Sequence, residues 1–196
     1  WKKNLLIKYL CPRDFRRGEM EEIMKRKINT LLASDYKRYS STREMPKFQK
    51  WMRKYQETDN RILKIIYRII FVILRKRNCV EISAKPVIGG GLYIGHPYCI
   101  TINPKAVIGV NCNIHKGVTI GQENRGERKG TPTIGNKVWI GVNATVVGKI
   151  HIGDDVLIAP NTYVNFDVPS HSIVINTKAN IISKQDATVH YINHIS

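Results

Sequence analysis

An isoleucine or valine recurs every six residues through the middle of the chain, and this repeat restricts the fold more than any other feature. Fourteen positions carry it, twelve with Ile and two with Val. They are Ile82, Ile88, Ile94, Ile100, Ile102, Ile108, Ile114, Ile120, Ile134, Ile140, Val146, Ile152, Ile158 and Val164. The count slips by two residues between Ile100 and Ile102 and is interrupted from Gln122 to Thr133. A period of six excludes an α-helix, whose period is 3.6.

Each six-residue unit fits one short strand followed by a turn. The residue after the anchor is often glycine, which would permit tight or left-handed backbone at a corner. These glycines are Gly89, Gly95, Gly109, Gly121, Gly135, Gly141 and Gly153. The fourth residue after the anchor is mostly small or apolar, so each unit has two inward side chains. Three units make one triangular coil, and stacked coils predict a parallel β-helix that buries the isoleucine column.

The first 80 residues have a different composition. They hold 22 of the 32 Lys and Arg residues and 8 of the 15 Asp and Glu residues. Helical spacing predicts one helix around Met20–Leu32, a second that opens at Pro46, and a third from Asp59 to Arg77. We therefore expect an α+β chain by content, with a basic helical N-terminal region at 1–80, a β-helix at 81–184 and a C-terminal tail at 185–196.

The third predicted helix has isoleucines along one side but also carries Lys64 and Arg68, so it is too short and too charged to span a bilayer. The favoured interpretation is a core helix packed on the prism or on a partner helix. The alternative is a basic amphipathic helix at a membrane surface. No zinc-finger or RNP pattern occurs, so nucleic acid is not a predicted partner. The four cysteines show no C-x-x-C spacing, which fits a reducing cytoplasm.

Three stretches resemble the serine acetyltransferase family: Glu81–Pro97, Ile114–Gly121 and Pro132–Gly141. The likeness covers about residues 75–184. It implies a left-handed winding of the parallel β-helix, acetyl-CoA as the acetyl donor, a homotrimer and a cytoplasmic enzyme. Contact with the inner face of the membrane would then use the basic N-terminal region.

In that family an acid at the first rung and a histidine fifteen residues later form a dyad, and Glu81 and His96 have this separation. A positioned imidazole can take the proton of an attacking hydroxyl, and a carboxylate can orient and stabilise it. The resemblance therefore implies that His96 is the general base and Glu81 its partner. His115 is the competing base, and Lys116 and Thr131 are further candidates for the acceptor site.

The resemblance also implies where the donor binds, along the edge of the later rungs. The residues expected to line it are Gly121, Gly141, Val142, Ala159 and Pro160, with Lys178 near a phosphate. The polar segment Gln122–Thr133 would form a loop that covers the active site between neighbouring prisms. A zinc site would need three histidine ligands. His96 and His115 could supply two, but no third histidine has a matching spacing, so we predict no metal. A zinc hydratase is the remaining alternative.

Two departures from the family concern the acceptor. Gly95 stands where serine acetyltransferases have an acid, and Gly130–Thr131 stands where they have Arg-His. These differences favour a saccharide acceptor, often lipid-linked, and a closer likeness to capsule and exopolysaccharide O-acetyltransferases. L-Serine is the alternative acceptor. A different class of function, a non-catalytic trimeric β-helix scaffold, is the other alternative.

Overall fold

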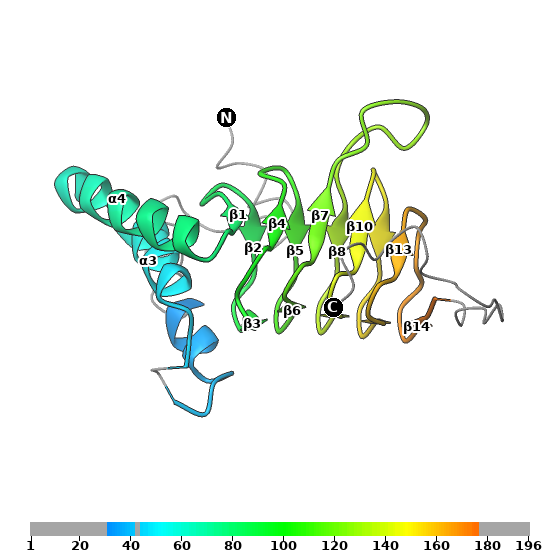
Figure 1. The fold of residues 1–196 in the computed structure, drawn as a ribbon, viewed down its shortest axis with the longest axis horizontal. Coiled ribbons are helices and arrows are strands. Elements are labelled where there is room, and N and C mark those ends of the chain that lie inside the picture. Colours follow the sequence, from blue (N-terminus) through cyan, green and yellow to red (C-terminus); the bar gives the residue numbers. More distant parts are fainter. Residues whose placement is uncertain (1–30, 42–43, 177–196) are drawn as a thin grey trace, which may run out of the picture.

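The chain folds into helices followed by a solenoid of very short strands (Figure 1), in a computed structural model that describes residues 31–41 and 44–176. Residues 31–36 are helical, and helices α3 (Lys47–Glu57) and α4 (Arg61–Arg77) follow. The strands are β1 (Glu81–Ile82), β2 (Val87–Ile88), β3 (Tyr93–Gly95), β4 (Thr101–Ile102), β5 (Val107–Ile108), β6 (Asn113–His115), β7 (Thr119–Gly121), β8 (Thr133–Ile134), β9 (Trp139–Ile140), β10 (Thr145–Val147), β11 (His151–Ile152), β12 (Leu157–Ile158), β13 (Tyr163–Val164) and β14 (Ile173–Val174). Most of the predicted helix at Met20–Leu32 and the whole predicted tail lie outside the described residues.

The strands form three parallel sheets that make the sides of a prism. Sheet A has the order β1-β4-β7-β10-β13, sheet B the order β2-β5-β8-β11, and sheet C the order β3-β6-β9-β12-β14. As far as β13, every third strand in the sequence returns to the same sheet, so each complete coil gives one strand to each side. In the last coil an isolated bridge between Ile152 and Val168 takes the place of a strand of sheet B. Since adjacent strands pair in parallel, the predicted parallel β-helix is confirmed.

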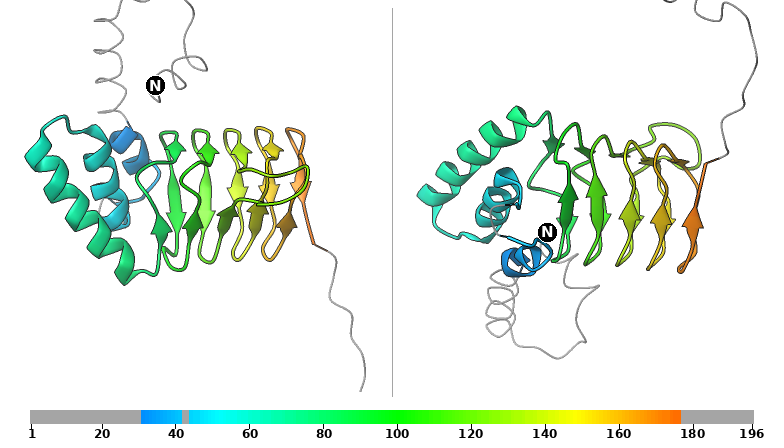
Figure 2. Two further views of the ribbon diagram at one scale, coloured as in Figure 1. Left: turned by 90° about the horizontal axis from the view of Figure 1, so that it is seen from above. Right: turned by 60° about the horizontal axis from the view of Figure 1, so that its bottom comes forward.

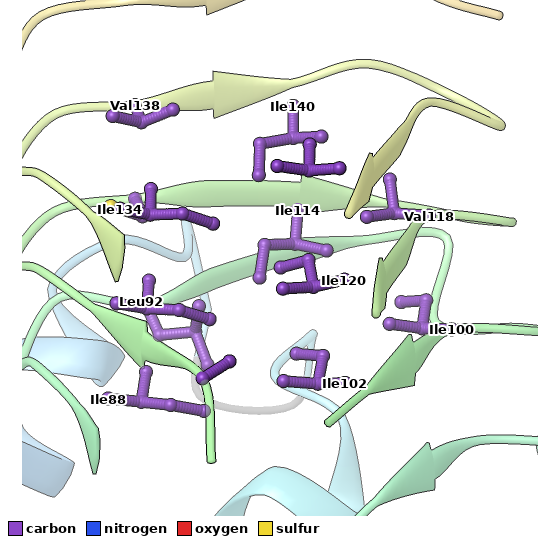
Figure 3. Packing of buried hydrophobic residues seen from close by; sticks show 14 of the residues in the cluster. Ile88, Leu92, Ile100, Ile102, Ile114, Val118, Ile120, Ile134, Val138 and Ile140 are labelled. Carbon is purple, nitrogen blue, oxygen red and sulfur yellow. The ribbon is translucent and has the colours of Figure 1, made fainter. Parts of the chain in front are cut away.

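The anchor side chains fill the inside of the prism in columns, as Figure 3 shows. Ile82 pairs with Ile102, and Ile102 pairs with Ile120 in the next coil. All of the anchors are buried, with at most 5% of any of them exposed. Each buried aliphatic side chain contributes about 1.5–3 kcal/mol relative to an exposed one, so the column is the main stabilising element of the solenoid.

Ile100 is not an anchor of the repeat, contrary to the sequence prediction. Its carbonyl accepts a hydrogen bond from Glu81 N, just as the carbonyl of Val118 accepts one from Thr101 N. Ile100 is therefore the equivalent of Val118, at the second inward position of a unit. The two extra residues lie before Ile100, in the corner that begins at His96, rather than between Ile100 and Ile102.

None of the glycines after the anchors has the left-handed backbone that the sequence allowed for, and they instead serve the close stacking of the coils. Positive φ values occur instead at other glycines, such as Gly91 and Gly117. A Cβ added at Gly109 would lie 2.4 Å from the carbonyl oxygen of Gly135 in the next coil. Any side chain there would push the coils apart, because backbone cannot yield as a flexible side chain can.

A buried polar cluster from the helices closes the open edge of the first coil. Arg53 pairs with Asp35 at 2.8 Å, and both side chains are 0–1% exposed. Arg53 donates to the carbonyls of Ile88 and Gly89, and Asp35 accepts from Leu92 N. These contacts supply hydrogen-bond partners for peptide groups of the first coil, which has no preceding coil to pair with. An unpaired strand edge would otherwise be able to pair with another chain and aggregate. Figure 2 shows the helices at this end of the prism.

Helix α4 packs against α3 with the face opposite to its isoleucines. Asn60 caps its start by accepting hydrogen bonds from Ile62 N and Leu63 N. It contacts α3 through Tyr67, whose ring lies 5.3 Å from that of Trp51, and it buries Phe71. The isoleucine side stays exposed, at 44–71% for Ile62, Ile65, Ile66, Ile69 and Ile73. None of the described helices is long and apolar enough to cross a membrane.

Candidate active site

One edge of the prism gathers most of the predicted site residues. It is the corner at which each strand of sheet C turns toward sheet A, and we call it the C–A edge. His96, Lys116, Val142 and Pro160 lie there in successive coils. Backbone hydrogen bonds of 2.9–3.1 Å join these corners, from Gly117 N to Tyr98 O, Asn143 N to Lys116 O and Asn161 N to Val142 O. Gly141 and Ala159 lie beside Val142 and Pro160 at the same corners. The repeat therefore places the candidate base His96 and four predicted donor-site residues along one line.

His96 occupies the widest corner of the first coil. Glu81 pairs with Thr101 twenty residues later, whereas Thr101 pairs with Thr119 eighteen residues later, so this corner holds two extra residues. His96 has a φ of 52°, a left-handed conformation that few non-glycine residues adopt. Its side chain is exposed. The extra length and the left-handed turn present the imidazole outside the prism, where it is accessible to substrates.

Glu81 lies on β1, at the start of the coil that ends at His96. Glu81 N donates to Ile100 O at 2.8 Å, and Cys99 N donates to Asn78 O at 3.1 Å. These bonds hold the His96 corner beside the segment that leads into β1. Among the described residues no hydrogen bond or ion pair joins the Glu81 carboxylate to the His96 ring. The dyad stays a prediction for the substrate-bound, assembled protein.

His115 lies next to this corner, one coil further on. Strand β6 pairs with β3, which sets His115 opposite Gly95. Its ring lies 6.3 Å from that of Tyr93 and 4.8 Å from that of Trp139. Burial lowers the pKa of His115, and the neighbouring His96 lowers that pKa further. His115 is therefore neutral at neutral pH, which suits a hydrogen-bonding group as well as a base.

Two predicted site residues lie at a different corner, between sheets A and B. Gly121 ends β7, and Thr131 belongs to the loop that leaves this corner and projects from the prism (Figure 1). The Thr131 hydroxyl donates to Lys105 O at 3.3 Å, and backbone bonds between Glu123 and Gly130 close the loop into a narrow hairpin. Sheet A separates these residues from His96 within one chain, so the structure does not bring them together.

The backbone amides of the predicted donor-site residues Gly141 and Ala159 are not free to bind a ligand. Gly141 N donates to Ile158 O and Ala159 N to Val174 O, so both amides are used in sheet C. What Gly141, Val142, Ala159 and Pro160 present is a small apolar surface. Lys178 lies outside the described residues. Within the described part of the chain, no group of three or more His, Cys, Asp and Glu side chains could hold a metal ion.

The His115 ring is packed between the side chains of Tyr93 and Trp139. Neither residue was predicted from the sequence to belong to the site. They precede the anchors Ile94 and Ile140, as Asn113 precedes Ile114. The residue before each anchor points outward, so writing the sequence in coils would have placed all three in one column. That alignment is the signal that could have found them.

The fold and this edge define a class of protein, the hexapeptide-repeat transferases. The profile of the family "Bacterial transferase hexapeptide (six repeats)" matches residues 131–165. The chain is 37% identical over 119 residues to the serine acetyltransferase of Helicobacter pylori, a match that covers 61% of this chain and 70% of that protein. The serine acetyltransferase of Synechococcus elongatus is 33% identical over 132 residues, which cover 67% and 54%. The chain therefore belongs to the serine acetyltransferase family of hexapeptide-repeat transferases.

A solved structure agrees with this assignment. Serine acetyltransferase isoform 3 from Entamoeba histolytica, determined with cysteine, superposes with a TM-score of 0.63 at 26% identity. The match covers 83% of this chain but only 63% of that one. The chain thus spans less than two thirds of the length of this structural relative.

The predicted saccharide acceptor, and with it the closer likeness to capsule and exopolysaccharide O-acetyltransferases, is wrong. The relatives and the solved structure are serine acetyltransferases, which favours the alternative acceptor. The expectation of a saccharide depended in part on the lack of an acidic side chain at Gly95. The structure shows that the imidazole of His115 lies over Gly95, so a polar group is present there but comes from the next coil.

Proposed function

We propose that the chain is an acetyl-CoA-dependent serine O-acetyltransferase. The observation that carries the proposal is its 37% identity over 119 residues to a serine acetyltransferase. The exposed His96 on the C–A edge supports it, because the reaction needs an accessible base. In the proposed reaction, the serine hydroxyl oxygen attacks the thioester carbonyl carbon while His96 takes the hydroxyl proton. The carbon–sulfur bond breaks, and the proton passes to the departing thiolate, which leaves O-acetylserine and coenzyme A.

The thioester donor would lie along the C–A edge, next to Val142 and Pro160. A small apolar edge suits an extended pantetheine chain, which needs contact area more than charge. We propose a homotrimer, because the loop Gln122–Thr133 lies across sheet A from His96 in its own chain. In a trimer this loop would instead reach the His96 corner of a neighbouring subunit.

The test is release of free thiol from acetyl-CoA in the presence of L-serine. We expect thiol release that requires both substrates and a product whose acetyl group is on the serine oxygen. No release at millimolar serine would overturn the proposed acceptor. No detectable binding of acetyl-CoA by calorimetry would favour the non-catalytic scaffold instead.

The exposed face of α4 favours a second role, contact with an anionic membrane surface. This helix has six basic residues and no acidic residue, beside its strip of exposed isoleucines. A second copy of the helix would bring like charges together, whereas an anionic lipid surface complements them. An amphipathic basic helix lies in the interface and buries its aliphatic strip among the acyl chains.

We expect the full chain to sediment with vesicles that contain phosphatidylglycerol and not with vesicles of phosphatidylcholine alone. Ile65→Gln with Ile69→Gln should weaken this binding at least about tenfold, because two aliphatic side chains lose their burial in lipid. The matched control is Val87→Gln with Val107→Gln, at residues of sheet B with 38–39% exposure. Equal binding to both vesicles would refute the proposal. Self-association that the Ile65 and Ile69 changes abolish would assign the face to another copy.

A further inference from the structure

We propose that His115 is a second acceptor-binding residue, which donates a hydrogen bond from Nδ1–H to the carboxylate of the amino-acid acceptor. This inference rests on the proposed function and adds to it the group that selects the acceptor. It assigns His115 a positioning role beside the base His96, rather than the role of a competing base.

The placement of the ring is the first observation. A Cβ added at Gly95 would lie 2.5 Å from His115 Nδ1 and 2.7 Å from Cε1, so the imidazole covers the backbone of Gly95. Gly95 is the residue directly before His96. Only glycine at this position leaves room for the ring, and the ring consequently borders the corner that presents the base.

The surroundings of the ring are the second observation. Tyr93 contacts it edge-on from the first coil, and Trp139 lies against it in the third coil. Nε2 is buried and has no hydrogen-bond partner among the described residues. Nδ1, on the Gly95 side, is not enclosed in this way and makes no hydrogen bond in the described part of the chain. The aromatic walls therefore fix the ring and leave one nitrogen to face a ligand.

The protonation state then selects the kind of ligand. The neutral imidazole carries one proton and one lone pair. Nε2 lacks a partner in either tautomer, at a cost of about 1–3 kcal/mol, but with the proton on Nδ1 the ring can still donate a hydrogen bond to a ligand. We therefore assign the Nδ1–H tautomer, in which the group that faces the His96 corner is an N–H donor. Of the charged groups of L-serine, the carboxylate accepts such a bond, and a bond to an ionised acceptor is the stronger kind.

The proposal predicts a selective loss of acceptor affinity when Nδ1–H is removed. In His115→Gln and His115→Ala we expect the KM for L-serine to rise about 10- to 100-fold, the effect of one charge-assisted hydrogen bond. The kcat and the KM for acetyl-CoA should stay within about threefold. The matched control is His151→Gln, the same exchange at an exposed histidine on sheet B, which should leave all three constants unchanged.

A second acceptor separates binding from folding. Because 2-aminoethanol has the hydroxyl and the amine but no carboxylate, its KM should not respond to the His115 change. The preference of the enzyme for L-serine over 2-aminoethanol should therefore fall by the same 10- to 100-fold factor, about one charge-assisted hydrogen bond. Equal losses for both acceptors, or an unchanged KM for serine, would overturn the inference.

The Gly95→Ala variant tests the geometry without altering His115. The added methyl should displace the ring and raise the KM for serine, and it should have no further effect in a chain that already carries His115→Ala. Additive effects of the two changes would contradict the contact. Thermal unfolding confirms that each variant is folded. A wild-type chain that releases no thiol with serine would overturn the proposed function, whereas an active wild type with unaltered variants would overturn this inference alone.

Discussion

Replacement of His96 by alanine is expected to lower turnover with acetyl-CoA and L-serine by about 10²–10⁴-fold, the usual contribution of a positioned general base. The serine hydroxyl would keep its proton during attack on the thioester. Folding should be unaffected, because the His96 side chain is exposed and makes no hydrogen bond with the described residues. Thiol release under saturating substrates measures the loss, and thermal unfolding checks the fold.

The control for this prediction is His151→Ala, an exposed histidine on another side of the prism, which should turn over at the wild-type rate. A near-wild-type rate for His96→Ala would reject His96 as the base. Glu81→Gln tests the partner separately, because an amide keeps the shape of the carboxylate but cannot stabilise an imidazolium. Unchanged turnover in that variant would mean that His96 acts without Glu81.

The six-residue period predicted the solenoid because it reports which side chains point inward. Each six-residue unit is one short strand and one corner, and its isoleucine side chain points into the prism whatever the neighbouring residues are. The period did not reveal why glycine follows the anchors. That reason lies between coils, in the approach of Gly109 to the backbone of Gly135, and no sequence window of six residues contains both. It also misplaced Ile100, because an isoleucine at the second inward position resembles an anchor.

The candidate site could be predicted from the sequence where it coincides with an interruption of the six-residue repeat. The extra residues after His96 and the loop after Ile120 both break the count of six. The role of Gly95 was misjudged, since its neighbour His115 lies twenty residues away and is brought beside it only by the coil register. The sequence likewise left open which face of α4 is buried. Periodicity identifies a face, but only tertiary structure decides whether that face or the opposite one, with Phe71, is buried.

The buried Arg53–Asp35 pair had no sequence signal at all, yet its loss should have the largest effect on stability. Arg53→Met is expected to lower the free energy of unfolding by about 3–5 kcal/mol, because it leaves the Asp35 carboxylate buried without its partner. Chemical denaturation of the full chain measures the change. The matched control is Arg128→Met, whose pair with Glu123 is 34–49% exposed and should contribute at most about 1 kcal/mol.

The double variant Asp35→Leu with Arg53→Met distinguishes an ion pair from a cap on the prism. If the pair mattered only as two opposite charges, apolar replacement of both would restore most of the stability. In this chain, however, Asp35 also accepts from Leu92 N, and Arg53 also donates to Ile88 O and Gly89 O. Those peptide groups would be left buried and unpaired, at about 1–3 kcal/mol each. We therefore expect the double variant to stay strongly destabilised, and recovery to wild-type stability would show that the first coil needs no polar cap.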